Sequence, residues 1–174
     1  SYLLMENVKV GNKRVDIDSS GFIIENDAYW WNADGIYFKT PYQTYALGYT
    51  ITYPKVEKTN DTKFRLIEGY VNEYERELME GSPDYANYLD LESASVWLLS
   101  HDIMGTWDSG GSNMYLYKES MDTEDLYSNK MKLGPTWDFD SSYQQVDSWS
   151  KIHTDPWMHF DVLLQKDDIY SMPS

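Results

Sequence analysis

The sequence predicts an α+β fold in which an antiparallel, strand-rich N-terminal part, residues 1–54, packs on a helical part, residues 55–174, that carries a β-hairpin. Short runs of β-branched and aromatic residues separated by turn signals fill the first part. Apolar residues at helical spacing dominate the second part. Because the chain has 174 residues, 41% of them hydrophobic and 16% aromatic, we expect one domain over residues 1–174 with its own core.

The N-terminal part has the pattern of an antiparallel meander. Turn residues such as Gly11-Asn12 separate its apolar runs, and Pro54 closes the last one, since proline cannot donate to a strand ladder. The predicted strands are residues 8–10, 15–17, 22–24, 36–38 and 49–53.

Two helices are predicted next. The first starts around Asn60-Asp61-Thr62 and ends at Gly81, with Glu and Arg on its outer face. Its apolar positions recur every three or four residues: Phe64, Ile67, Tyr70 or Val71, Tyr74 and Leu78. The second helix is capped by Asp90 and stopped by Gly105. Because it is apolar nearly all round, we expect it to be the buried centre of the helical part.

The segment after the second helix predicts a hairpin and then an acidic motif. A strand over 114–118, a polar loop over 119–130 and a return strand over 131–133 lead through Gly134-Pro135 into residues 136–140. Alternation there places Trp137 and Phe139 on one side and Asp138 and Asp140 on the other. A last helix is expected over 156–164, with Asp155 as its cap.

The composition excludes several classes of function. A net charge of −15 and a pI near 4.4 leave no basic face for duplex nucleic acid or an anionic membrane surface. No apolar run approaches the ~20 residues of a membrane-spanning helix. The absence of cysteine removes disulfides, thiolate metal sites and cysteine nucleophiles. The three histidines, His101, His153 and His159, lack metal-site spacing and are expected at the surface.

Four oxygen-bearing side chains have the layout of a kinase catalytic centre. Asp108 and Asn113 are five residues apart across a Gly-rich turn after a helix, and Asp138 and Asp140 follow the next hairpin. In such a centre the first Asp accepts the substrate hydroxyl proton, while the Asn and the later Asp hold metal. Mg²⁺ needs only oxygen ligands, which these residues have. The alternative is that Asp108 and Asn113 are turn residues bonded to their own backbone.

At these residues the chain resembles the CotH family, the spore coat protein H kinases. That family typically shows an Asn-x-Asp before a Tyr-x-Tyr-Lys strand and a Gly-Pro-x-Trp-Asp-x-Asp segment after it. Here the matching residues are Asp108, Ser112-Asn113, Tyr115-Leu116-Tyr117-Lys118 and residues 132–140. Residues 2–6, 21–25, 61–79, 85–90 and 157–164 are also similar to family segments, so the resemblance covers nearly the whole chain.

The resemblance implies a protein-kinase-like fold that uses ATP and Mg²⁺ or Mn²⁺ to phosphorylate protein hydroxyls, mainly of serine. By position, Asp108 matches the catalytic Asp and Asp138 the metal-binding Asp, while Asn113 falls where a Ser or Asn precedes the Tyr-x-Tyr strand. Asn113 is a candidate metal ligand by the kinase-like layout, and Asp140 is a candidate second metal or structural ligand. Glu6, in the Tyr-x-Leu-x-Glu segment, is the candidate nucleotide-binding residue. The implied partners are proteins with Ser-rich segments, at an extracellular, cell-surface or spore-coat location.

The sequence departs from the family at two places. Thr106 stands where the family usually has Asn, and the acidic loop over 119–129 is longer than usual. In the family a nucleotide-clamping lobe with a phosphate-pairing Lys precedes the Tyr-x-Leu-x-Glu segment, with which this chain begins. We therefore expect part of a complete kinase domain, in which Lys9, Lys39 and Lys55 are either phosphate contacts or solvated residues.

Two other functions remain open from the residues alone. The aromatic cluster Tyr29-Trp30-Trp31 suits a secreted module that binds carbohydrate or protein, since flat rings stack on such ligands. Paired acids such as Asp108 and Asp138 also suit a glycosidase. The Asp-to-Asn loop has no role in glycoside hydrolysis, so that alternative ranks last.

Overall fold

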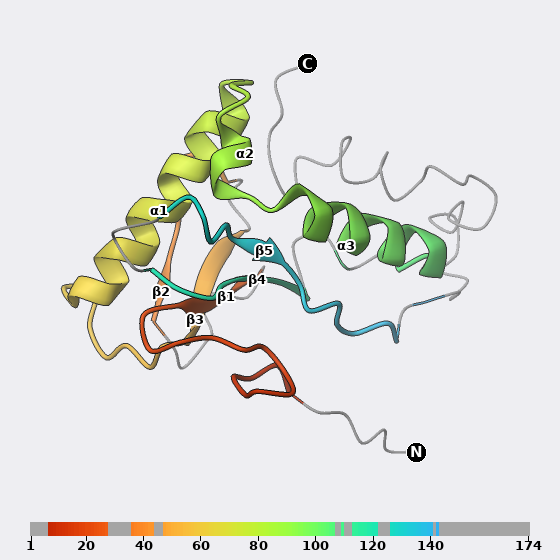
Figure 1. Ribbon diagram of the computed structural model, residues 1–174, viewed down its shortest axis with the longest axis horizontal. Coiled ribbons are helices and arrows are strands. Elements are labelled where there is room, and N and C mark those ends of the chain that lie inside the picture. The colour runs from red at the N-terminus through yellow and green to blue at the C-terminus, as the bar shows by residue number, and fades with distance from the viewer. Residues whose placement is uncertain are drawn as a thin grey trace.

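The computed structural model describes residues 7–27, 36–43, 47–106, 109, 113–121, 126–140 and 142. Within these ranges the chain forms one five-stranded antiparallel sheet with helices, which confirms the predicted mixture of helix and antiparallel strand (Figure 1). The strands are β1 (Phe22–Asp27), β2 (Tyr37–Phe38), β3 (Gly48–Tyr53), β4 (Met114–Lys118) and β5 (Lys132–Leu133). The helices are α1 (Thr62–Met79), α2 (Tyr85–Tyr88) and α3 (Leu91–Met104). No described helix is both long and apolar enough to cross a membrane.

The order of the strands is not that of the predicted meander. The sheet runs β2-β3-β1-β4-β5, so β1 is central and pairs with β3 on one side and β4 on the other. Ile24 marks the register, since it lies opposite Ile51 of β3 and Leu116 of β4. The hairpin β4–β5 therefore belongs to the same sheet as the N-terminal strands.

The two strands predicted over 8–10 and 15–17 are also absent. This segment makes a single bridge between Val10 and Val15, closed by a hydrogen bond from Gly11 N to the Val15 carbonyl at 3.0 Å. Its turn uses backbone groups that a ladder would need, so no strand propagates. Its apolar side chains instead cover the sheet, since Val15 and Ile17 pack in one cluster with Ile23.

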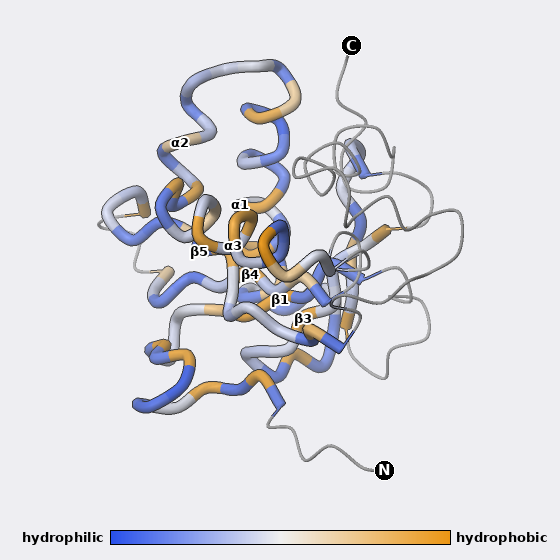
Figure 2. Tube along the Cα trace, turned by 90° about the vertical axis from the view of Figure 1, so that its right-hand side faces the viewer, coloured by the Kyte–Doolittle hydropathy of each residue, from blue (hydrophilic) through white to orange (hydrophobic). Residues whose placement is uncertain are grey.

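Helix α1 covers the opposite face of the sheet. Asp61 caps it by accepting from Lys63 N at 2.8 Å, which places the helix start within the predicted Asn60-Asp61-Thr62. Tyr70 packs edge-on against Phe22 with ring centroids 6.1 Å apart, and Phe64 meets Phe38 in the same way at 5.9 Å. Figure 2 shows apolar segments of the strands and helices meeting in the interior. The predicted apolar face of α1 is thus confirmed, and it forms the main core with the sheet.

One residue on α1 contradicts the prediction that its Glu side chains are all on the outer face. Glu75 is fully buried, and the Tyr49 hydroxyl donates to its Oε1 at 2.7 Å. Burial raises the pKa of Glu75 from 4.5 to about 7, although the hydrogen bonds it accepts favour the charged form. The core of the sheet and helix therefore encloses an acid that gains a proton near neutral pH.

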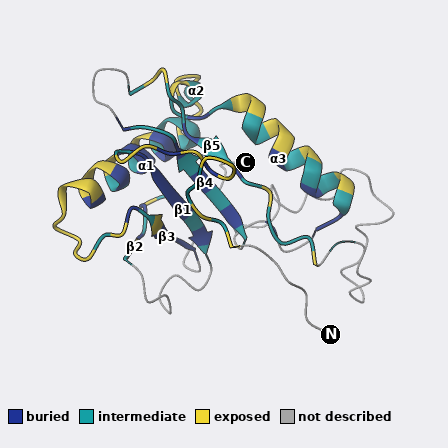
Figure 3. Cartoon of the chain, turned by 60° about the horizontal axis from the view of Figure 1, so that its bottom comes forward, coloured by how far each residue is buried: buried dark blue, intermediate teal, exposed yellow. Residues whose placement is uncertain are grey.

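Helix α3 has the predicted ends but not the predicted burial. Asp90 Oδ1 accepts from Ser93 N at 2.7 Å, and Gly105 closes the helix with φ of 62°. Trp97 and His101 are its buried residues, whereas other apolar side chains are exposed, so the expectation of a buried central helix is wrong for the described chain (Figure 3). The reason is that α3 contacts the rest of the described protein along one face, next to β5.

Candidate functional site

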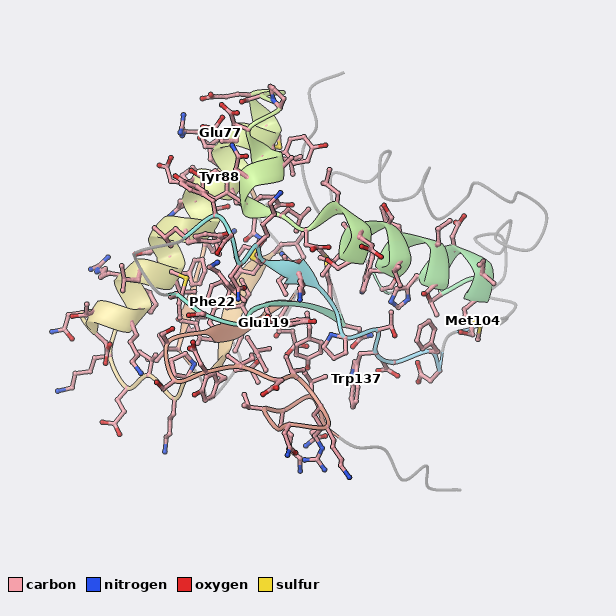
Figure 4. All side chains as sticks on the ribbon, in the orientation of Figure 1. Phe22, Glu77, Tyr88, Met104, Glu119 and Trp137 are labelled. Atoms are coloured by element: carbon pink, nitrogen blue, oxygen red, sulfur yellow. The ribbon has the colours of Figure 1, made fainter. Side chains whose placement is uncertain are left out.

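Asp138 lies in the segment after β5, which contacts both the sheet and the C-terminal part of α3. Trp137 packs edge-on against Tyr115 of β4, with ring centroids 6.4 Å apart, and Phe139 stacks on His101 of α3 at 4.7 Å. Figure 4 shows Trp137 below the helix whose last residue is Met104. Asp138 is thus held between two anchored aromatic neighbours, at the point where the sheet and α3 meet.

The predicted alternation over 136–140 is wrong. These residues form no strand, Trp137 and Phe139 are only half-buried, and they contact different elements. The cause is the backbone of Asp138, which has φ of 55° and so interrupts the extended conformation that alternation requires. Asp138 is half-buried and Asp140 is exposed.

Asn113 shares this unusual backbone conformation. Among the described residues, two that are not glycine have positive φ, and they are Asn113 at 61° and Asp138 at 55°. The left-handed region costs roughly 1–2 kcal/mol for a residue with a side chain, less for Asn and Asp. Such residues cluster at functional sites, where the surrounding structure enforces the geometry. The strained positions coincide with two of the predicted metal ligands.

The chain after α3 is fixed by buried polar contacts. His101 is fully buried, so the expected surface position is wrong, and its Nδ1 lies 2.6 Å from Thr106 Oγ1. The Thr106 hydroxyl also donates to the His101 carbonyl at 3.3 Å, and the Ser109 hydroxyl donates to the Thr106 carbonyl at 3.1 Å. Thr106, the departure from the family pattern, therefore has a structural role: it ties the loop to the helix end.

The face of the sheet near Asp138 carries two more acids. Glu25 and Asp27 alternate with Asn26 along β1, and the Tyr115 hydroxyl hydrogen-bonds to Glu25. Burial raises the pKa of Tyr115, and the negative charges of Glu25, Asp27 and Asp138 raise it further. Burial also raises the pKa of Glu25. These acids therefore lie close enough to Asp138 to act on one hydroxyl.

The sequence reasoning gave little weight to this acidic face. Glu25, Asp27 and Tyr115 were not among the predicted site residues. The signal that finds them is two acids spaced by two residues at the end of an otherwise apolar strand, because that spacing puts both on one face. That Glu25 lies beside Tyr115 follows only from the pairing of β1 with β4.

A pocket of about 330 Å³ opens beside Trp137. This volume is within the range of small-molecule sites, roughly 300–1,000 Å³. Lys9 contributes positive charge to it, whereas Lys39 and Lys55 are not among its lining residues. The lining residues are Asn7, Val8, Lys9, Arg14, Val15, Tyr117, Pro135, Thr136 and Trp137.

Of the predicted ligands, Asn113 and Asp138 carry oxygen donors of the type that Mg²⁺ accepts. Within the described ranges no three His, Cys, Asp or Glu side chains group to hold a metal ion. Mg²⁺ usually takes only one or two protein carboxylates and completes its shell with phosphate oxygens and water. Asp138 offers a carboxylate and Asn113 a carboxamide oxygen, both of the hard type that Mg²⁺ prefers.

Several predictions fall outside the described residues. They are the catalytic role of Asp108, the nucleotide-binding role of Glu6, the aromatic cluster Tyr29-Trp30-Trp31 and the helix over 156–164. These stay predictions.

Comparison with known proteins identifies the family. The family model described as CotH: CotH kinase protein matches residues 2–170, nearly the whole chain. No curated protein and no solved structure matches the chain.

Proposed function

Since this chain belongs to the CotH kinase protein family, we propose that it transfers the γ-phosphoryl group of ATP, with Mg²⁺ or Mn²⁺, to serine hydroxyls of a protein. The observation that carries the proposal is that the two candidate metal ligands Asn113 and Asp138 are the described non-glycine residues with left-handed backbone conformations. The protein-kinase-like fold, the Ser-rich partner and a location at the cell or spore surface belong to the same proposal.

In this mechanism the chain mainly positions groups and removes one proton. Asp108 accepts the proton of the serine hydroxyl while the serine oxygen attacks the γ-phosphorus and the bond to the β–γ bridging oxygen breaks, releasing ADP. Asn113 and Asp138 would hold the cation, which would neutralise the charge on the phosphates. The aromatic contacts of Trp137 and Phe139 keep the Asp138 carboxylate in place.

The metal role is tested by calorimetric titration of Mn²⁺ into the chain in the presence of ATP. We expect Asp138→Asn to weaken Mn²⁺ binding at least about tenfold, since even outer-shell changes at metal sites cost that much. The matched control is Asp84→Asn, which removes the same charge at an exposed site before α2. Equal Mn²⁺ affinity in the two variants would refute the metal role of Asp138.

The chemical role is tested separately by phosphate transfer from ATP to a serine-containing peptide. Asp108→Asn should keep Mn²⁺ affinity and lose transfer by at least about 100-fold, the lower range for removal of general base catalysis. Transfer at the unaltered rate in Asp108→Asn, with binding lost in Asp138→Asn, would leave a metal site without the proposed base.

A further inference from the structure

The pocket beside Trp137 is a positively charged site in a negatively charged protein. The chain has 29 acidic and 14 basic side chains, yet the described residues that line the pocket include Lys9 and Arg14 and no acid. The protein as a whole repels anions, and physiological salt screens charges beyond about 8 Å, so an anion is held here only by direct contact with these two cations. The charge of the pocket therefore favours an anionic ligand.

The cations stand on a segment whose backbone is fixed. Lys9 and Arg14 belong to residues 9–15, which fold back on themselves as a tight turn. Gly11 N donates to the Val15 carbonyl at 3.0 Å, and Arg14 N donates to the Gly11 carbonyl at 2.8 Å. The Val15 side chain is buried in the cluster that covers the sheet. Both cations are thus presented from a turn that is anchored to the sheet.

The opposite wall of the pocket is aromatic. Gly134 N donates to the Tyr115 carbonyl at 2.8 Å, which ties the segment after β5 to β4. In that segment Trp137 packs on Tyr115 and lines the pocket with Pro135, while Tyr117 of β4 supplies a second ring. Figure 4 shows Trp137 extending from the ribbon toward the N-terminal turn. With a volume of about 330 Å³, the pocket has room for an organic group as well as an anion.

The pocket adjoins the candidate metal site. Trp137 lines the pocket and Asp138 follows it directly, so their Cα atoms are about 3.8 Å apart. An extended peptide advances roughly 3.3–3.6 Å with each residue. A peptide that presents a serine at the candidate metal site therefore places a residue only a few positions away in the pocket.

The proposed reaction itself makes an anion of a suitable kind, and the inference rests on that proposed function. A phosphorylated serine carries a charge of about −1.5 to −2 and three acceptor oxygens, which suit the donors of Lys and Arg. In a serine-rich segment this group stays tethered to serines that have not yet reacted. Binding it therefore raises the effective concentration of the next serine at the site.

We propose that the pocket formed by Lys9, Arg14, Tyr117 and Trp137 binds a phosphoserine residue of the serine-rich protein substrate, a few residues from the serine at the candidate metal site. Lys9 and Arg14 donate to the phosphate oxygens, and the two rings contact the residue beside the phosphoserine. Each phosphorylation thereby creates the recognition group for the next one.

Binding is measured without ATP or metal, so that it does not depend on phosphoryl transfer. A fluorescently labelled serine peptide with one phosphoserine, and the same peptide without phosphate, are titrated with the full chain and followed by anisotropy. We expect the phosphopeptide to bind at least about tenfold more tightly, since a hydrogen bond to a charged group is worth about that much. Lys9→Gln and Arg14→Gln should each remove most of this preference. The matched control is Lys13→Gln, which removes an equal charge from the same turn at an exposed residue that does not line the pocket.

Three results of the binding experiment would overturn the proposal. One is equal affinity for the two peptides. Another is an equal loss in Lys13→Gln and Lys9→Gln, because the preference would then come from general charge. The third is displacement of the phosphopeptide by AMP, with an AMP affinity that falls in Lys9→Gln, which would assign the two cations to the nucleotide.

Phosphate transfer separates this proposal from the proposed function. With ATP and Mn²⁺ added, the phosphopeptide should have a KM at least about tenfold lower than the unphosphorylated peptide and a similar kcat, because the pocket binds the ground state and the transition state alike. Tight binding of the phosphopeptide with no transfer to either peptide would refute the proposed function and support the phosphoserine site. Transfer to both peptides with equal KM would support the proposed function and refute the phosphoserine site.

Discussion

The buried carboxyl of Glu75 makes the stability of the fold depend on pH in a direction opposite to that of most acids. In the unaltered chain the Tyr49 hydroxyl donates to Glu75 Oε1 at 2.7 Å. Glu75→Gln keeps an oxygen that can accept this hydrogen bond and removes the ionisable group. Burial raises the pKa of Glu75 from 4.5 to about 7. The folded protein therefore binds a proton that the unfolded chain releases over that interval.

The size of the effect follows from the shift. A displacement from 4.5 to about 7 corresponds to ~3 kcal/mol, since one pKa unit is about 1.4 kcal/mol. Because the folded pKa is the higher one, this stability is fully present below 4.5 and is lost as the pH rises through about 7. Above that range the folded state either holds a desolvated charge or admits water to it.

Urea unfolding of the unaltered chain and of Glu75→Gln, each at several pH values, measures the effect. The difference in unfolding free energy should change by up to ~3 kcal/mol in favour of Glu75→Gln between roughly pH 4 and pH 9. Taking the difference between the two proteins cancels the other titrating groups. Parallel pH profiles would refute the reasoning, because they would mean that Glu75 has the same pKa in the folded and unfolded chain.

Two further substitutions test local features of the fold. Asp90→Ala removes the carboxylate that accepts from Ser93 N at 2.7 Å, so it should lower the free energy of unfolding in urea by about 1 kcal/mol. Asp90→Asn should lower it less, because asparagine can also cap a helix. An unchanged urea midpoint in Asp90→Ala would contradict the capping role. Gly21→Ala would place a Cβ in a clash with the carbonyl oxygens of Lys118 and Glu119. Thermal unfolding should therefore show a loss of stability of ~1–3 kcal/mol, and an equally stable Gly21→Ala protein would show that this approach is not tight.

Features set by neighbouring residues were predictable from the sequence. The helix starts at Asp61 and Asp90 and the stop at Gly105 depend on contacts within one turn, and the structure has all three. The strand over 114–118 was predicted with its exact bounds, because its alternation and flanking turns are local signals.

Features set by distant pairing were not predictable. The position of β1 between β3 and β4 depends on contacts across most of the chain, and several orders satisfy the same local pattern. The burial of Glu75 and His101 was missed because each lies among residues whose partners come from other elements. The composition of α3 predicted burial on all sides, whereas in the described chain only Trp97 and His101 of this helix are buried.

The motif names Asn113 and Asp138 as candidate ligands, a role that stays a prediction, but it does not indicate their geometry. Their left-handed backbone is seen only in the structure. The acidic neighbours Glu25 and Asp27 could be placed only after the register of β1 and β4 was known.

The anchoring of Trp137 to the sheet and of Phe139 to α3 has a mechanical consequence for the carboxylate between them. The position of the Asp138 carboxylate depends on the distance between the sheet and α3. Under the proposed metal role of Asp138, substitutions that displace α3, even at its distant N-terminal end, should therefore alter cation affinity without changing a ligand. A bound cation should in turn protect both elements against hydrogen exchange.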